Sequence, residues 1–145
     1  MKNFIVLLIV TLSLMFTPLI GNAQDKNTVA NESVNRIEVI DFHSTNRCFT
    51  CNAIEANTKY TLETYFNDEL ESGKITFQTI NIDEEINQEL AEYYEASGTS
   101  LFLNVIISEK ETHINLTNFA FMNGRKQKEF SEKLKTKINT ELNKL

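Results

Sequence analysis

The sequence predicts a single α/β domain built around a mixed β-sheet. Stretches with the composition and alternation of strands are separated by stretches with the three- to four-residue apolar repeat of amphipathic helices. In the first half of the domain each strand-like run precedes a helix-like run, which calls for parallel strands, whereas two strand-like runs near residues 101–121 indicate an antiparallel hairpin. We therefore expect the order β-α-β-α-β-β-α, with a mixed four-stranded sheet and helices on both faces.

The beginning of the chain has the pattern of a secretory signal. Lys2 precedes an apolar run at residues 4–20, and small residues at 21–23 follow it. An uncleaved membrane anchor is the alternative, but Pro18 and the small residues that follow the apolar run favour cleavage of a signal peptide. We expect an exported, periplasmic protein without membrane contact after cleavage. The expected parts are a signal peptide at 1–23, a flexible polar lead-in at 24–35 and one folded domain at 36–145.

Two successive strand-helix units are expected at the start of this domain. Residues 36–42 (RIEVIDF) and 74–82 (KITFQTINI) are rich in β-branched and aromatic side chains, and a helical apolar repeat follows each of them. The residues expected to face the core are Ile54, Thr58, Leu62, Tyr65 and Leu70 in the first helix, Ile75, Phe77, Ile80 and Ile82 in the second strand, and Ile86, Leu90 and Tyr93 in the second helix at 83–97.

A hairpin and a final helix complete the expected fold. Residues 101–107 (LFLNVII) and 113–121 (HINLTNFAF) are strand-like, and the charged segment 108–112 joins them. In residues 124–145 an apolar side chain recurs every four residues among Lys and Glu, which favours a helix packed on the sheet over a partner-binding groove. The side chains of this stripe are Phe130, Leu134, Ile138 and Leu142.

Composition excludes some functions. The chain has 14 basic and 20 acidic side chains and a net charge of −6, so we do not expect a nucleic-acid partner. Beyond the apolar start, the glycines are Gly73, Gly98 and Gly124, which do not form the glycine-rich loop of a dinucleotide or flavin site. We therefore expect no cofactor other than a disulfide.

The two cysteines, Cys48 and Cys51, lie at the first strand-to-helix junction. The unpaired N–H groups and positive end of a helix stabilise a thiolate there, and Arg47 adds a positive charge. We expect Cys48 to be the nucleophile and Cys51 the resolving thiol of a redox couple. A soft-metal or metalloid site and a structural disulfide are the alternatives, and a four-ligand zinc site would need both His43 and His113.

Asp41 and His43, which precede the cysteines in the sequence, are candidates for proton transfer. Asp41 interrupts an apolar strand, and a buried carboxylate there can accept the proton that Cys51 loses during resolution. In the alternative interpretation Asp41 faces water or pairs with Arg47. His43 is either a proton shuttle near the thiolate or a hydrogen-bonded structural residue.

The element order and the position of Cys48 and Cys51 resemble the thioredoxin fold, over nearly all of residues 36–145. The resemblance implies that the IDF stretch ending at Phe42 corresponds to the VDF stretch that carries a buried acid in thioredoxins. The dipeptide between the cysteines, Phe49-Thr50, differs from that of thioredoxins. Ser100, after Thr99, stands where thioredoxins have a cis-proline that faces the cysteines, so we expect a trans peptide or a rearranged loop there.

Longer motifs resemble one family more closely. DFHSTNRCFTCNAIE at 41–55, ASGTSLFL at 96–103 and NGRKQKEF at 123–130 resemble the ArsF family of exported Bacteroidota proteins, described as nitrophenyl-compound nitroreductase subunits. The resemblance implies an electron-passing or accessory subunit. The expected partner is a redox protein, and a soft metal or trivalent arsenic is the alternative ligand.

Overall fold

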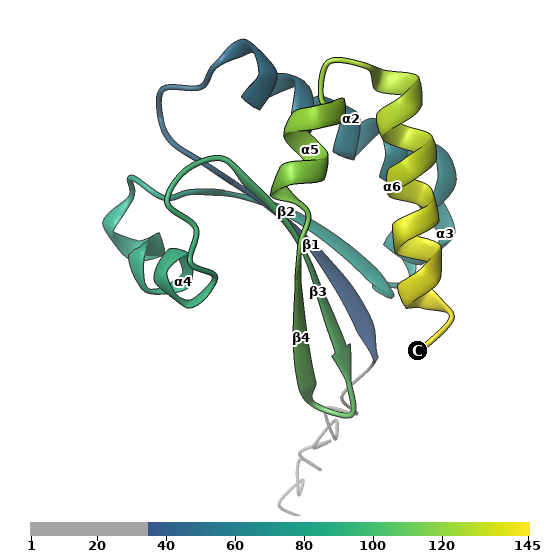
Figure 1. Ribbon diagram of the computed structural model, residues 1–145. Helices are drawn as coiled ribbons and strands as arrows, with labels where there is room; N and C mark the ends of the chain where they lie inside the picture. Colours follow the sequence, from purple (N-terminus) through teal and green to yellow (C-terminus); the bar gives the residue numbers. More distant parts are fainter. Residues whose placement is uncertain (1–34) are drawn as a thin grey trace, which may run out of the picture. The chain divides into compact units, whose positions relative to one another are not determined.

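The computed structural model describes residues 35–145 (Figure 1). The expected signal peptide and nearly all of the expected lead-in lie outside these residues. The sheet has four strands in the order β2-β1-β3-β4. β1 (Arg36–His43) pairs in parallel with β2 (Ile75–Asn81) and antiparallel with β3 (Ser100–Ile107), which pairs antiparallel with β4 (Lys110–Asn115). The sheet is therefore mixed, as predicted.

The helices cover both faces of this sheet (Figure 1). Helices α2, α5 and α6 pack on one face, and α4 packs on the other. None of the helices in the described part of the chain has the length and apolar character needed to cross a bilayer. The bounds are α2 Phe49–Tyr65, α3 Asn67–Glu71, the 3₁₀ turn η1 Glu85–Asn87, α4 Gln88–Tyr93, α5 Thr117–Asn123 and α6 Gln127–Leu142.

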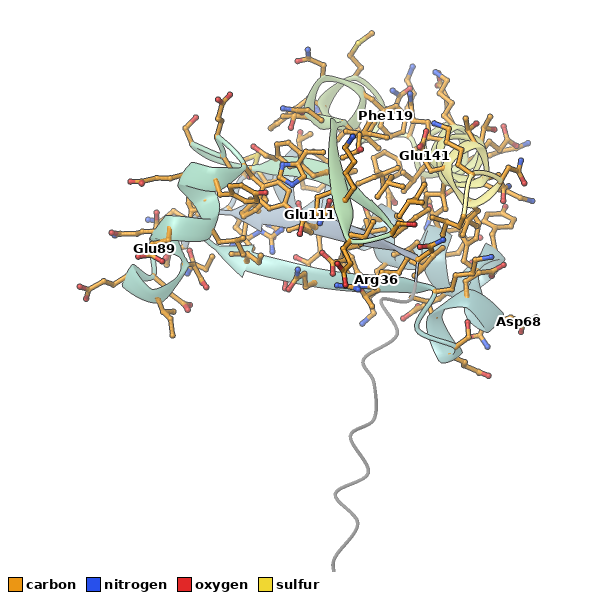
Figure 2. All side chains as sticks on the ribbon, turned by 90° about the horizontal axis from the view of Figure 1, so that it is seen from below. Arg36, Asp68, Glu89, Glu111, Phe119 and Glu141 are labelled. Carbon is orange, nitrogen blue, oxygen red and sulfur yellow. A yellow bond between two sulfur atoms is a disulfide. The ribbon has the colours of Figure 1, made fainter. Side chains whose placement is uncertain are left out.

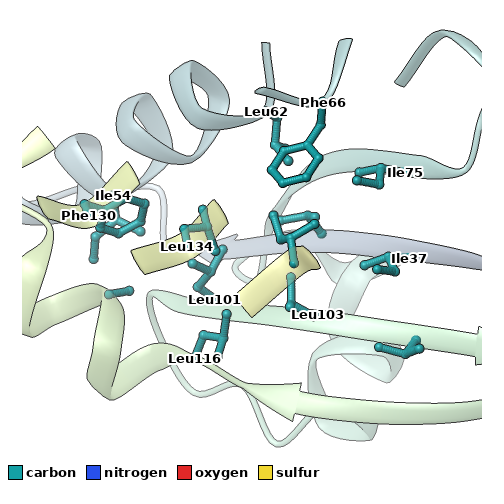
Figure 3. Packing of buried hydrophobic residues seen from close by; sticks show 14 residues of the cluster. Ile37, Ile54, Leu62, Phe66, Ile75, Leu101, Leu103, Leu116, Phe130 and Leu134 are labelled. Carbon is teal, nitrogen blue, oxygen red and sulfur yellow. The ribbon is translucent and has the colours of Figure 1, made fainter. Parts of the chain in front are cut away.

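Two hydrophobic clusters, one on each face, fix the helices to the sheet. Successive side chains of a strand point to opposite faces, so Ile37 and Val39 of β1 join the cluster under α2 and α6, while Ile40 and Phe42 join the cluster under α4. Figure 3 shows the larger cluster, in which side chains of the sheet meet those of α2 and α6. The predicted α6 stripe is confirmed, because Phe130, Leu134 and Ile138 have no exposed surface.

The prediction for the end of the hairpin was wrong. The second hairpin strand ends at Asn115, and the residues that follow it form α5, which the sequence pattern did not predict. The Asn115 side-chain oxygen accepts a hydrogen bond from the Thr117 backbone N–H at 2.9 Å, which turns the chain out of the strand. Leu116 and Ala120, four residues apart, are then buried on the helical face.

The predicted apolar face of the second helix was also wrong, except for Leu90, which packs against the cluster under α4. Ile86 and Tyr93 are 87% and 61% exposed, whereas Ala91 and Tyr94 are buried. The segment starts with a 3₁₀ turn of three residues, which changes the phase of the side chains before α4 begins. Tyr94 then anchors α4, with its ring centroid 5.3 Å from that of Phe42.

The first helix is shorter than its apolar repeat suggested. α2 ends at Tyr65, which is 39% exposed, and Phe66, which the repeat did not include, is 2% exposed and fills the core. Leu70 lies half-buried on the separate short helix α3. Apart from α5 and these changes of phase, the predicted α/β order, with its four-stranded mixed sheet and helices on both faces, is confirmed.

Candidate functional site

Cys48 and Cys51 form a disulfide at the N-terminus of α2, and their Cα atoms are 5.0 Å apart. Cys48 is the N-cap residue of this helix and has an extended backbone conformation. The Cys51 backbone N–H lies 3.0 Å from the Cys48 sulfur and donates to it. A thiolate formed at Cys48 on reduction would accept a hydrogen bond from this N–H group and would be stabilised by the positive end of the helix dipole.

The two sulfur-bearing residues differ in accessibility. Cys48 is exposed, whereas Cys51 is only 8% exposed. Attack on a disulfide requires that the incoming sulfur reach the sulfur it bonds to. The arrangement therefore offers Cys48 to an external sulfur and leaves Cys51 as the internal member of the pair.

Arg47 is held by two carboxylates. Its Nη2 donates to Asp41 Oδ2 at 3.1 Å, and its Nη1 donates to Glu55 of α2. The Arg47 side chain is 16% exposed, and the Asp41 side chain has no exposed surface. Asp41 is therefore buried, as the proton-transfer interpretation requires, and it is also paired with Arg47, as the alternative interpretation proposed. We call these three residues, Asp41, Arg47 and Glu55, the charged triad.

Glu55 was not a site residue in the sequence analysis. A signal for it existed, because Glu55 follows Cys51 by four residues, and this spacing places two side chains on one face of a helix. Its carboxylate joins the second turn of α2 to the loop residue Arg47. The triad therefore ties the end of β1, the loop and α2 together around the base of the disulfide-bearing turn.

Burial raises the pKa of Asp41 to about 7. The positive charge of Arg47 and its hydrogen bond lower this pKa, while the negative charge of Glu55 raises it further. The second carboxylate oxygen, Oδ1, is buried and accepts no hydrogen bond from any residue in 35–145. Asp41 thus exchanges a proton near neutral pH, where an ordinary aspartate is fully ionised.

The two histidines lie in different surroundings. His43, the last residue of β1, is half-buried, and its Nδ1 is 3.1 Å from the Ser44 carbonyl oxygen. His113 stacks on Tyr94 with ring centroids 4.1 Å apart, and its Nε2 is 3.2 Å from a Glu111 carboxylate oxygen. Within residues 35–145 no group of three or more His, Cys, Asp or Glu side chains is arranged to hold a metal ion.

The segment that contains Thr99 and Ser100 begins β3. Ser100 pairs with Phe42 near the carboxyl end of β1, so this segment lies at the same end of β1 as the cysteine loop. The described chain, 35–145, contains no cis peptide bond, and the Thr99–Ser100 bond is trans as expected. The Ser100 hydroxyl donates to the Gly98 carbonyl at 3.2 Å.

The loop before the cysteines is fixed to a neighbouring loop. The Thr45 backbone N–H donates to Asp83 Oδ2 at 2.7 Å, and the Asn81 amide donates to the Thr45 hydroxyl at 3.1 Å. Asn81 ends β2, the parallel neighbour of β1. These contacts hold the loop that leads into the disulfide against the adjacent strand end.

The fold and the site define an α/β domain with a mixed four-stranded sheet and a disulfide at the N-terminus of its first sheet-packed helix. No protein-family model matches this chain, and no curated protein matches it significantly in sequence. Among solved structures it is similar to thioredoxin of Fasciola hepatica, with 19% identity, a TM-score of 0.47, and coverage of 77% of this chain and 86% of that chain. It is similar also to a thioredoxin of Thermus thermophilus, with 19% identity, a TM-score of 0.46, and coverage of 70% and 72%. The strand order and the positions of the helices, described above, define the fold.

Proposed function

We propose that this protein is a thiol-disulfide oxidoreductase that exchanges the Cys48–Cys51 disulfide with a protein partner. The observation that carries the proposal is the disulfide itself. One of its residues caps a helix and is exposed, and the other is buried one turn further along. This asymmetry suits a sequential exchange, in which the partner bonds to one sulfur and the second sulfur completes the reaction.

In the oxidising direction, a partner thiolate attacks the Cys48 sulfur and the Cys48–Cys51 bond breaks, which leaves Cys51 as a thiolate that takes a proton. A second partner thiol loses its proton and attacks the first partner sulfur, which breaks the mixed disulfide and releases Cys48 as a thiolate. Two electrons pass from the partner dithiol to this protein. The reducing direction is the reverse sequence: the Cys48 thiolate attacks a partner disulfide, Cys51 attacks the resulting mixed disulfide, and the partner leaves as a dithiol while the Cys48–Cys51 disulfide forms. A separate dithiol reductant must then reduce this disulfide before the next cycle.

The charged triad supplies proton handling in this scheme. Asp41 has a pKa of about 7, so it is suited to accept the proton of Cys51 when that thiol attacks a mixed disulfide. Arg47 is engaged by two carboxylates, and we assign it to holding Asp41 in place as well as adding positive charge near Cys48. His43 remains a further candidate for proton transfer at the end of β1.

We further propose that the reaction takes place outside the cytoplasm, because the chain begins with a signal-like pattern and disulfides persist in the oxidising compartments to which such signals lead. The ArsF-like motifs support a role as an electron-passing or accessory component of a larger redox system. In that setting the substrate is a disulfide or dithiol of a partner protein.

Trapping of a mixed disulfide tests the proposed function. The reduced Cys51→Ala variant should form a stable covalent adduct with a cyclic peptide that holds one disulfide, because no resolving thiol remains. The reduced Cys48→Ala variant is the matched control and should form far less adduct, since its remaining cysteine is buried. Absence of any adduct with Cys51→Ala, together with stoichiometric arsenite binding by the reduced parent protein, would instead indicate a thiol-based binding module.

A further inference from the structure

We propose that Phe49 and Arg125 form a docking surface beside Cys48 that recognises a partner segment with an acidic side chain next to its reactive disulfide. We call this pair the Phe49–Arg125 surface. The inference rests on the proposed exchange function and specifies the kind of partner that it uses.

Phe49 is the exposed apolar side chain closest in sequence to the reactive sulfur. It follows Cys48 directly as the first residue of α2, and it is 73% exposed. The Arg125 guanidinium carbon lies 5.2 Å from the centre of the Phe49 ring, within the range of a cation–π contact.

The position of Arg125 is set by tight packing between α2 and the turn that joins α5 to α6. The Asn57 amide of α2 donates to the Gly124 carbonyl at 2.8 Å, and this bond is buried. A Cβ atom at Gly124 would lie 2.8 Å from Ile54 Cγ1 and 3.5 Å from Thr50 Cγ2. The absence of a side chain at 124 therefore brings Arg125 against the first turns of α2, beside Phe49.

Arg125 also carries a positive charge that the described residues do not neutralise. Within 35–145 no carboxylate lies within ion-pair distance of its guanidinium. The lysines and arginines that do lie within ion-pair distance of a carboxylate are Arg36, Arg47, Lys59, Lys126, Lys133 and Lys144. Arg125 is thus available to a negative charge on another molecule.

Charge is segregated along the domain in a way that favours an acidic partner on this side. The segment 75–109, which includes α4, has no Lys or Arg, and Figure 2 shows Glu89 of α4 projecting outward, away from Phe119 of α5. The segment 124–137 has a basic excess, with two acidic side chains, Glu129 and Glu132, against the six basic ones Arg125, Lys126, Lys128, Lys133, Lys135 and Lys137. An acidic partner is repelled by the α4 region and attracted to the Phe49–Arg125 surface.

These features define how the partner lies. Its reactive sulfur meets Cys48, an apolar part of its chain covers Phe49, and a carboxylate within a few residues of the cysteine pairs with Arg125. The cation–π contact already positions the guanidinium beside Phe49, so little ordering is needed when the carboxylate arrives. The bond changes are those of the exchange described above, and the acid takes no part in them.

Exchange rates with three cyclic peptides test the inference. The peptides share one disulfide and differ in a single flanking residue, which is Glu, Gln or Lys. At low salt the protein should react about fivefold faster with the Glu peptide than with the Gln peptide, and added salt should reduce this preference. In Arg125→Gln the ratio should fall close to one, and in Arg125→Glu the Lys peptide should become the preferred substrate. Reversal of preference is a result that a purely structural role of Arg125 would not produce.

Lys110→Gln is the matched control, because it removes one positive charge at the hairpin end of β4, where Lys110 pairs with Ile107. This variant should keep the preference of the parent protein. Equal rates with all three peptides in the parent protein would overturn the Phe49–Arg125 surface and leave the exchange function standing. Failure of the parent protein to exchange with any peptide would overturn both proposals.

Discussion

Asp41 of β1 and Arg47 of the following loop form a buried ion pair, with Asp41 Oδ2 and Arg47 Nη2 3.1 Å apart. The Asp41 side chain has no exposed surface, and the Arg47 side chain has 16%. Burial of charges in this way costs free energy that the pair and its additional hydrogen bonds must offset. For Asp41 the cost of burial is larger than the stabilisation by Arg47, so its pKa is raised. This raised pKa has consequences that can be measured.

The stability of the protein should fall as the pH rises from 4 to 7. Asp41 has a pKa of 3.8 when exposed and about 7 in the folded protein, so in this range the folded state keeps a proton that the unfolded state loses. The free energy of unfolding should therefore decrease with pH by up to about 4 kcal/mol relative to an Asp41→Asn variant, which lacks this titration. Below pH 4 both states are protonated, and above pH 7 both are ionised, so the difference is constant. Urea unfolding of both proteins between pH 4 and 8 measures it, and parallel curves would contradict the prediction.

Removal of the Glu55 charge should lower the pKa of Asp41. The negative charge of Glu55 raises this pKa, and in Glu55→Gln that contribution is lost while Arg47 can still pair with Asp41. In an NMR pH titration the carboxyl carbon of Asp41 should then show a lower pKa in Glu55→Gln than in the parent protein, where burial raises this pKa to about 7. Glu63→Gln is the control, since Glu63 lies on the same helix, is exposed and is 3.9 Å from Lys59. An unchanged titration in Glu55→Gln would show that Glu55 does not act on Asp41.

Asp41→Asn should slow the resolution of a mixed disulfide. Without a carboxylate to accept the Cys51 proton, the rate constant for release of the peptide at pH 7 should fall about 100-fold or more. In the parent protein this rate should rise with pH through the pKa of Asp41, near 7, because the ionised carboxylate is the base. The variant should lose that inflection. Asp68→Asn, an exposed position on α3, is the control and should keep both the rate and the inflection.

Gly124→Ala should destabilise the protein by about 1–3 kcal/mol. The new Cβ would lie 2.7 Å from the Ala120 carbonyl oxygen and 2.8 Å from Ile54 Cγ1, so the α5–α6 turn must move away from α2. Gly98→Ala is the matched control, because a Cβ at that position meets nothing within 4 Å. Urea unfolding compares the two variants with the parent protein. Equal stability of all three proteins would mean that the turn accommodates a side chain without loss of packing.

The parts of the fold that could be predicted are those whose local pattern agrees with their tertiary surroundings. The stripe of α6 and the strands β1 and β3 have long apolar patterns, and a core on one or both faces is the stable way to bury them. Short segments were less predictable. Leu116 and Ala120 belong to a helix only because the chain turns at Asn115 and covers the larger cluster, and an alternating pattern there also fits a strand.

The candidate site divides in the same way. Local sequence determined that Cys48 and Cys51 stand at the start of a helix that follows a buried strand, because strand composition, helix periodicity and cysteine spacing all act over a few residues. It also determined the acidic balance of the chain and the trans peptide at Ser100.

Only the tertiary structure decided that Arg47 is shared by Asp41 and Glu55, and that Arg125 lies on Phe49 although the two residues are far apart in the chain. The physical reason is that a pKa and a cation–π contact depend on burial and on charges brought close by packing. Sequence spacing carries no measure of either when the partners lie on different elements.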